Sequence, residues 1–230
     1  EITTKIFRKK EEGGYLIDQI LDKAGNKGTG SWSSISSLEL GTDTSMMSAS
    51  VFARYLSSQK KTRVHLSTNF DAQKNETSIG IDKLKKAYDL ARRLNHLQGF
   101  ELLNTASTEF NWNLNLSEIA RIWTNGCIIR SNLMEELQIR FKSSQSLLND
   151  STTLLELKNQ EDDLSTIVKV FADARIAAPC FSTAWNYWIG ITTAIGPANL
   201  IQAQRDFFGA HTYQRIDDPT GTSYHTSWED

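Results

Sequence analysis

Proline is scarce in this chain of 230 residues, and its three copies, Pro179, Pro197 and Pro219, all lie toward the C-terminal end. Everything before Pro179 therefore lacks the strongest breaker of helices. No apolar run approaches the roughly 18 residues that a membrane-spanning helix needs, and no signal peptide is visible. The net charge is −2, which provides neither a basic field for nucleic acid nor an acidic tail. We therefore expect partners other than nucleic acid or a membrane.

Cysteine is also rare, and the common motifs of catalysis are missing. Cys127 and Cys180 form no disulfide framework and lie among apolar residues. They are expected to be buried free thiols in a reducing, cytoplasmic compartment, with a catalytic thiol as the alternative. The chain has no Gly-x-Gly-x-x-Gly after a strand, no P-loop, no nucleophile elbow and no His or Cys set at metal spacing. Because these motifs are missing, we expect no dinucleotide site and no metal site within these 230 residues.

Helical periodicity is abundant. From Ile81 to Leu97 apolar residues recur every three or four positions, with lysines and arginines between them, which predicts a long amphipathic helix continuing through Ala106. Residues 163–178 follow the same pattern and stop before Pro179. Strand signals are few, and residues 64–70 are expected to form a loop. Further helices are expected at residues 15–24, 32–40, 45–60, 117–123, 131–142, 181–194 and 198–208.

The predicted fold class is all-α, a large multi-helix domain with an extended C-terminal tail from about Gly209. The chain begins with Glu1 rather than Met, and its first Met is Met46, inside an expected helix. We therefore expect a piece of a longer protein.

The first candidate for chemistry is the loop that contains Lys27, Gly28, Thr29 and Gly30. A helix is expected to end near residue 24 with Gly25 as its cap, and the next helix to open at Gly30 or the serine after it. Lys27 offers a charge and Thr29 a hydroxyl, while the glycines would let the backbone approach an anion at a helix N-terminus. The alternative is a plain helix–helix connector with a solvated lysine.

The second candidate is Arg54, in an expected helix where Val51, Tyr55 and Ser58 share one face. The alternative is a surface arginine whose aliphatic stem covers apolar neighbours.

The third candidate is the pair Arg205 and His211, which lie on either side of the expected helix end at Gly209. A guanidinium can hold a phosphate through two hydrogen bonds, and an imidazole can donate to a further oxygen. The alternative is an arginine that bonds helix carbonyls beside a surface histidine.

The remaining polar and aromatic features favour structural roles. The histidines His65, His96 and His225 are expected to be surface or packing residues. The Trp185–Trp188 cluster indicates a core or an interface. Asn115 or Ser117 is expected to cap a helix, and the acidic run 161–163 to begin one rather than to bind a metal.

Five segments of the sequence are informative when they are taken together. They are Lys27-Gly-Thr-Gly30, Val51-Phe-Ala-Arg54-Tyr-Leu-Ser-Ser58, Glu118-Ile-Ala-Arg-Ile-Trp-Thr-Asn-Gly-Cys-Ile-Ile-Arg130, Pro197-Ala-Asn-Leu-Ile-Gln-Ala-Gln-Arg205-Asp-Phe-Phe-Gly-Ala-His211-Thr-Tyr213 and His225-Thr-Ser-Trp228. In this order, from about Phe7 to the end of the chain, the sequence resembles the 6-phosphogluconate dehydrogenase family. Ser31 departs from the lysine that usually follows the family's Gly-Thr-Gly motif.

The resemblance implies an NADP-dependent oxidative decarboxylase that converts 6-phosphogluconate to ribulose 5-phosphate and carbon dioxide. It implies that residues 1–208 form the family's helical domain without its first helix, and that residues 209–230 form a tail that reaches the partner subunit of a homodimer. Carried over from the family, Lys27, Thr29 and Arg54 match positions that bind the substrate phosphate. Arg205 and His211 match positions that the tail lends to the other subunit's active site.

The family's Rossmann domain, its catalytic lysine and its catalytic glutamate have no counterpart in this chain. We therefore expect no catalytic residue and no cofactor-binding residue here, NADP being held mainly by the missing domain, and no turnover by the chain alone. Two alternatives stay open, a non-catalytic helical dimerisation module and a related 3-hydroxyacid dehydrogenase that acts on a smaller acid.

Overall fold

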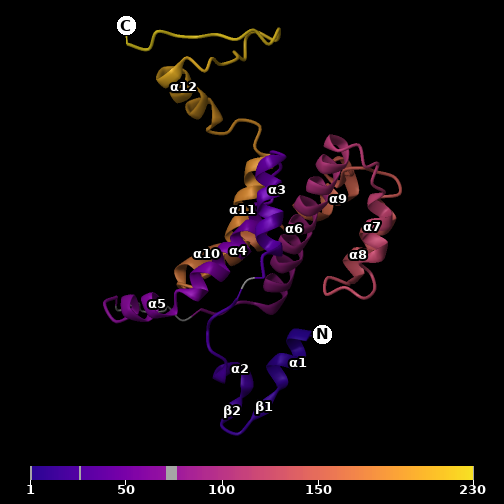
Figure 1. Ribbon diagram of the computed structural model, residues 1–230, viewed down its shortest axis with the longest axis vertical. Helices are drawn as coiled ribbons and strands as arrows, with labels where there is room; N and C mark the ends of the chain where they lie inside the picture. Colours follow the sequence, from indigo (N-terminus) through magenta and orange to yellow (C-terminus); the bar gives the residue numbers. More distant parts are fainter. Residues whose placement is uncertain (1, 26, 71–76, 230) are drawn as a thin grey trace. The chain divides into compact units, whose positions relative to one another are not determined.

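Helices make up most of the chain in the computed structural model, which describes residues 2–25, 27–70 and 77–229 (Figure 1). The all-α prediction is confirmed. The named strands of the described part are β1 (Lys10–Glu11) and β2 (Gly14–Tyr15), which form an antiparallel hairpin. The helices are α1 (Ile2–Arg8), α2 (Leu16–Gln19), α3 (Thr29–Glu39), α4 (Ser45–Ser58), α5 (Lys60–Ser67), α6 (Ile81–Glu109), α7 (Leu116–Ile122), α8 (Asn132–Arg140), the 3-10 helix η1 (Leu147–Asn149), α9 (Ser151–Lys158), α10 (Glu161–Asp173), α11 (Pro179–Thr192) and α12 (Ala198–Gly209).

The chain divides into two compact units, Glu1–Asn186 and Tyr187–Asp230, with the boundary inside α11. The second unit contains α12 and the residues that follow it. The division into residues 1–208 and 209–230 that the sequence suggests stays a prediction about the domains.

The core of the first unit lies along α6. Its Leu90 and Leu94 are fully buried, and the helix packs along α10, whose Leu164 and Ile167 are buried as well. The long amphipathic helix is therefore confirmed. The predicted helix over residues 163–178 begins two residues earlier and ends at Asp173, because Arg175 adopts a left-handed conformation with φ 54°.

Two arginines join α6, α8 and α9 in a half-buried ion network that the sequence did not reveal. Arg93 of α6 donates to both carboxylate oxygens of Glu136 at 2.8 and 3.0 Å and to Asp89 at 2.9 Å. Arg140 of α8 donates to Glu156 at 2.7 Å and lies 2.7 Å from Glu136. Shared carboxylates and paired hydrogen bonds of this kind fix the three helices more firmly than isolated surface pairs would.

Two expectations about the N-terminal third are wrong. The predicted helix over residues 15–24 is only the four-residue α2, because Tyr15 pairs in the hairpin and Ile20 is extended with ψ 131°. α2 also buries no residue, so no packing supports a longer helix. Gly25 therefore caps no helix. Residues 64–70, expected as a loop, fall largely in α5, where Arg63 donates to the Asp22 carboxylate at 2.8 Å.

Close packing of α3 on α4 explains one glycine of the candidate loop. A Cβ on Gly30 would lie 2.7 Å from Cγ2 of Val51, whereas a Cβ on Gly28 would meet nothing within 4 Å. Gly28 is needed instead for its backbone, since it caps α3 with φ 97°. The loop glycines thus have folding roles of their own, whatever ligand the loop binds.

Replacing Gly30 by alanine should lower the free energy of unfolding by about 1–3 kcal/mol, the usual cost of overpacking. Val51 is β-branched, so it cannot turn aside easily. Urea denaturation of the chain measures the effect. The matched control is Gly99→Ala in α6, where an added Cβ meets nothing within 4 Å and should stabilise by about 0.5–1 kcal/mol. Equal free energies for Gly30→Ala and the parent chain would contradict the packing account.

Candidate functional site

The first group of predicted site residues lies where α3 begins. Gly28 is the N-terminal cap of α3, and Thr29 is its first residue. Lys27 and Thr29 are both exposed. Neither side chain makes a hydrogen bond or an ion pair with the described part of the chain, so both remain available to an external ligand. The backbone N–H groups of the first turn of α3 add to the same positive region.

Contacts on either side of this loop place it over α4. Before the loop, the backbone N–H of Ala24 donates to Ser57 Oγ at 2.9 Å. After it, Ser31 Oγ and the Tyr55 hydroxyl share a hydrogen bond of 2.7 Å. The loop that carries Lys27 therefore spans the same stretch of α4 that carries Arg54.

Arg54 is exposed on α4. Its guanidinium has no hydrogen-bond or ion-pair partner among the residues that the structure describes, unlike Arg63, which is held by Asp22. An exposed arginine whose charge is not neutralised next to a lysine-bearing loop can bind a dianion. The structure thus brings the first three predicted residues, Lys27, Thr29 and Arg54, to one region of the first unit.

The second group, Arg205 and His211, belongs to the second unit. Helix α12 spans residues 198–209, within one residue of the prediction, and Arg205 is exposed on it with Nη1 donating to Gln202 Oε1 at 3.2 Å. His211 is exposed beyond the helix end, and its ring lies against Gly209, where a Cβ would be 3.0 Å from Nε2. Arg205 and His211 therefore lie at one end of one helix. Their meeting with Lys27, Thr29 and Arg54 in one site stays a prediction.

Sequence reasoning missed the residue that organises this end of the chain, Asp206. Its carboxylate is fully buried and accepts four hydrogen bonds, from the backbone N–H groups of Thr212 and Thr226 and the rings of His225 and Trp228. Burial alone would raise the pKa of Asp206, but these four donors outweigh it and lower the pKa to about 2. The carboxylate is therefore ionised at any physiological pH. His225, expected to be a surface or packing residue, is one of its donors.

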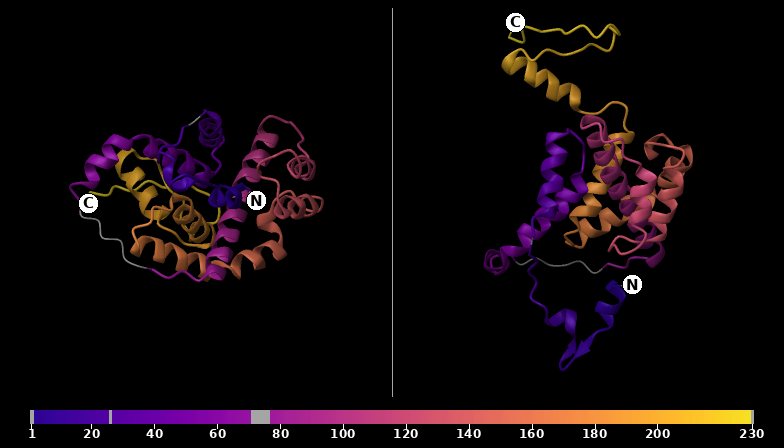
Figure 2. Two further views of the ribbon diagram at one scale, coloured as in Figure 1. Left: turned by 90° about the horizontal axis from the view of Figure 1, so that it is seen from below. Right: turned by 45° about the vertical axis from the view of Figure 1, so that its right-hand side comes forward.

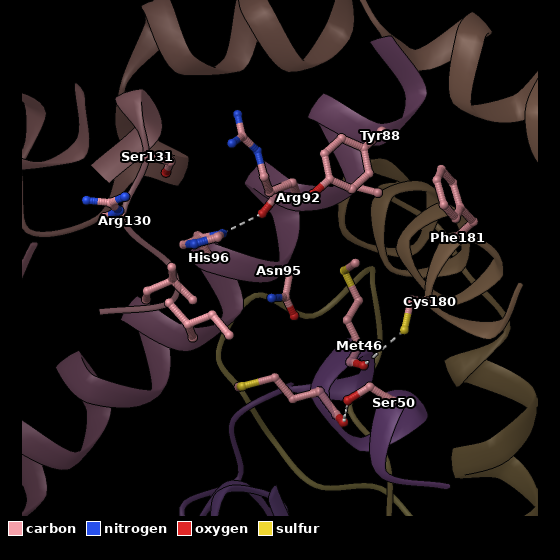
Figure 3. A pocket seen from close by; sticks show the side chains of 14 residues that line it. Met46, Ser50, Tyr88, Arg92, Asn95, His96, Arg130, Ser131, Cys180 and Phe181 are labelled. Atoms are coloured by element: carbon pink, nitrogen blue, oxygen red, sulfur yellow. Dashed lines mark hydrogen bonds between the residues drawn. The ribbon is translucent and has the colours of Figure 1, made fainter. Parts of the chain in front are cut away.

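A pocket of about 450 Å³ in the first unit is lined by Cys180, for which the sequence left a catalytic thiol as the alternative, and by residues that the sequence did not single out as a site. Figure 3 shows Arg92, His96 and Arg130 on one side of it and Met46 and Phe181 on the other. His96 Nδ1 lies 2.8 Å from the Arg92 carbonyl oxygen. Burial lowers the pKa of His96, which favours the neutral imidazole. None of the five predicted site residues lines this pocket.

Three smaller expectations can be compared with the structure. Cys127 and Cys180 are free but only half-buried, so their full burial was wrong, and burial raises the pKa of Cys180. The cap at Asn115 is confirmed by its hydrogen bond from the backbone N–H of Glu118. Trp188 is buried, in line with the expected packing role of its cluster. Across the described ranges, no helix is long and apolar enough to cross a membrane.

Comparisons of the sequence and of the structure with known proteins find relatives of the same family. A sequence model of the 6-phosphogluconate dehydrogenase C-terminal domain matches residues 1–228. The decarboxylating 6-phosphogluconate dehydrogenases of Escherichia coli (strain K12) and Klebsiella pneumoniae are 42% and 44% identical to the chain, over 100% and 99% of it and 50% of their own length. A solved 6-phosphogluconate dehydrogenase of Plasmodium falciparum superposes with a TM-score of 0.93 and 36% identity, over 99% of this chain and 51% of its own. That protein has been solved in its apo form, with its cofactor NADP+ and with its substrate 6-phosphogluconate.

The fold and these likenesses place the chain among the helical C-terminal domains of dehydrogenases. The chain belongs to the 6-phosphogluconate dehydrogenase family. It spans about half the length of the relatives that it matches. The resemblance stated on sequence motifs alone is thereby confirmed.

Proposed function

We propose that this chain is the substrate-binding and dimerising half of an NADP-dependent decarboxylating 6-phosphogluconate dehydrogenase, which converts 6-phosphogluconate to ribulose 5-phosphate and carbon dioxide. Lys27, Thr29 and Arg54 bind the substrate phosphate, and Arg205 and His211 complete its binding from the tail of the other subunit. NADP is held mainly by residues outside this chain. The parent enzyme is the longer polypeptide whose C-terminal half this chain would be. The proposal includes a cytoplasmic location for that enzyme.

The observation that carries the proposal is the placement of Lys27 and Arg54. Both are exposed, neither is neutralised by a carboxylate of the described chain, and the loop of Lys27 spans the segment of Arg54. A lysine beside the N-terminus of α3 and an arginine on α4, neither paired within the described chain, suit a phosphate dianion, because charge-assisted hydrogen bonds and the dipole of α3 can act on the same group. Binding energy at the phosphate would then hold the rest of the sugar in place for oxidation.

The dimer with exchanged tails is supported by the composition of the second unit. Within residues 193–229, the only fully buried side chain is the Asp206 carboxylate, so this segment has almost no apolar core of its own. Segments this small rarely fold alone without a partner surface or another constraint. Large apolar side chains are exposed along it, and an exposed set of this kind marks an interface. They are Ile195, Leu200, Ile201, Phe207, Phe208 and Ile216.

Calorimetric titration of the dimeric chain with 6-phosphogluconate tests the proposal without a need for turnover. We expect measurable binding of 6-phosphogluconate and at least about tenfold weaker binding of gluconate, since the lost charged hydrogen bonds contribute about 1.5–3 kcal/mol each. Arg54→Ala should remove most of that difference, whereas Arg121→Ala, at a surface arginine paired with Glu118, should leave it unchanged. Equal affinity for the two sugars, or no heat from a confirmed dimer, would count against a phosphate site.

A further inference from the structure

The most unusual group outside the predicted site is the buried Asp206 carboxylate. Each of its oxygens accepts two hydrogen bonds, Oδ1 from the Thr212 N–H at 2.9 Å and the His225 ring at 2.9 Å. Oδ2 accepts from the Thr226 N–H at 3.1 Å and the Trp228 indole at 2.9 Å. A buried carboxylate is costly unless its lone pairs are filled in this way. All four donors come from the tail, so the carboxylate holds the tail to α12.

We call Asp206 and its four donors, from Thr212, His225, Thr226 and Trp228, the clasp. Its Thr212 end lies beside the two predicted phosphate ligands, Arg205 and His211. Asp206 follows Arg205 directly, and Thr212 follows His211. Gln202 links the two sides, because its Nε2 donates to the Thr212 carbonyl while its Oε1 accepts from Arg205. Contacts from both sides thus fix the backbone that carries His211 relative to the helix that carries Arg205.

Backbone strain at the same place shows that these contacts are needed. Ala210 and Thr212, on either side of His211, have φ values of 49° and 58°. Residues with a Cβ seldom adopt this left-handed region, and they hold it only when surrounding contacts impose it. The Thr212 N–H bond to Asp206 and the Ala210 N–H bond to the Asp206 carbonyl at 2.9 Å are two such contacts. They direct the chain sharply off the helix and seat the His211 ring on Gly209.

The far end of the clasp returns the chain to the helix. Tyr213 and Tyr224 exchange backbone hydrogen bonds of 2.9 and 2.8 Å, which closes the intervening residues into a loop. In both Figure 1 and Figure 2 the yellow tail leaves α12, turns and returns toward the C-terminal end of that helix. His225, Thr226 and Trp228 then bind Asp206. The Asp206 side chain therefore binds both the start of the tail, at Thr212, and its end, at His225, Thr226 and Trp228.

We propose that Asp206 is a positioning residue that holds Arg205 and His211 in the arrangement that grips the substrate phosphate. This inference rests on the proposed function, because it gives Arg205 and His211 their ligand. Asp206 itself does not touch substrate, since its carboxylate is enclosed by the tail. It acts by holding the exposed guanidinium of Arg205 and the exposed imidazole of His211 in place before the substrate binds.

The test compares Asp206→Asn with the control Asp217→Asn in the parent enzyme. Asp217 is an exposed tail aspartate paired with Arg215, so its loss should leave the KM for 6-phosphogluconate unchanged. Asp206→Asn keeps the shape but cannot accept four hydrogen bonds. We expect its KM to rise about 10- to 100-fold, the scale of a misplaced binding group, with proteolysis of the tail accelerated. Trp228→Phe, which removes one hydrogen-bond donor to Asp206 and keeps an aromatic ring, should give a smaller rise in KM. It replaces Asp206→Asn as the test variant if the asparagine variant folds poorly.

A double-variant comparison separates positioning from general stability. In an Arg205→Ala/His211→Ala background, Asp206→Asn should add nothing further to the KM, because the residues through which it acts are gone. A further rise in that background, or an unchanged KM in a variant whose tail is released, would overturn the positioning role. If Arg205→Ala/His211→Ala itself leaves the KM unchanged, the proposed phosphate site fails instead.

Discussion

Replacing Arg205 by alanine in the parent enzyme is expected to raise the KM for 6-phosphogluconate about 10- to 100-fold, since charged hydrogen bonds contribute about 1.5–3 kcal/mol each. Arg205 is exposed, and within the described residues its guanidinium donates only to the neutral side chain of Gln202. Its charge is therefore free to bind an anion. A group that binds the phosphate, remote from the reacting carbon, should change KM more than kcat.

The control for this prediction is Arg215→Ala, in the tail that follows α12. Arg215 already donates to both carboxylate oxygens of Asp217, at 2.8 and 2.6 Å, so its charge is neutralised within the chain. Steady-state kinetics of the two variants should differ in KM, with Arg215→Ala close to the parent. A normal KM for Arg205→Ala would favour a substrate without phosphate, such as the smaller acid of a related 3-hydroxyacid dehydrogenase.

The helical framework could be predicted because its signals are local. The apolar repeat between Ile81 and Leu97 defines one face of α6, and the side chain of Asn115 caps α7 as its position suggested. The end of α12 at Gly209 lies within one residue of the predicted end, although the left-handed position that follows it is taken by Ala210 and not by the glycine. Each of these features depends on residues within one or two turns of one another.

The hairpin that replaces the predicted helix at residues 15–24 has a local signal in the sequence. Glu12 and Gly13 form the turn between β1 and β2, with φ 99° at Gly13, and Gly14 begins β2 with φ 129°. A Gly-Gly pair is a recognised hairpin signal. The hairpin takes Tyr15 away from the predicted helix. The helix over part of residues 64–70 could not be predicted, because α5 is polar and buries no residue, so no apolar repeat indicates a helix there.

The clasp and the ion network could not be predicted because their partners are distant in sequence. Asp206 binds residues up to 22 positions away, and Arg93 reaches Glu136 across 43 positions. No spacing rule links such residues until the helices are packed. Likewise, only the family resemblance predicts one phosphate site for Lys27 and Arg54, because the contacts of Ala24 and Ser31 with α4 that bring the two residues to one region are not visible in the sequence.

The central claim is that one phosphate site takes residues from two subunits, and mixed dimers distinguish this from a site built within one subunit. In a dimer of an Arg54→Ala subunit and an Arg205→Ala subunit, tail exchange puts both defects into one site. The other site then combines an intact Arg54 with an intact partner tail. If each tail served its own subunit, every site would carry one defect, and no intact site could form.

Kinetics of such mixed dimers, isolated with a different affinity tag on each subunit, are therefore the most direct measurement. The account predicts the parental KM for 6-phosphogluconate and about half the parental kcat per dimer, because one of two equivalent sites is intact. The two homodimeric variants, measured alongside, should both keep their raised KM. Mixed dimers that perform no better than these homodimers would contradict the shared site.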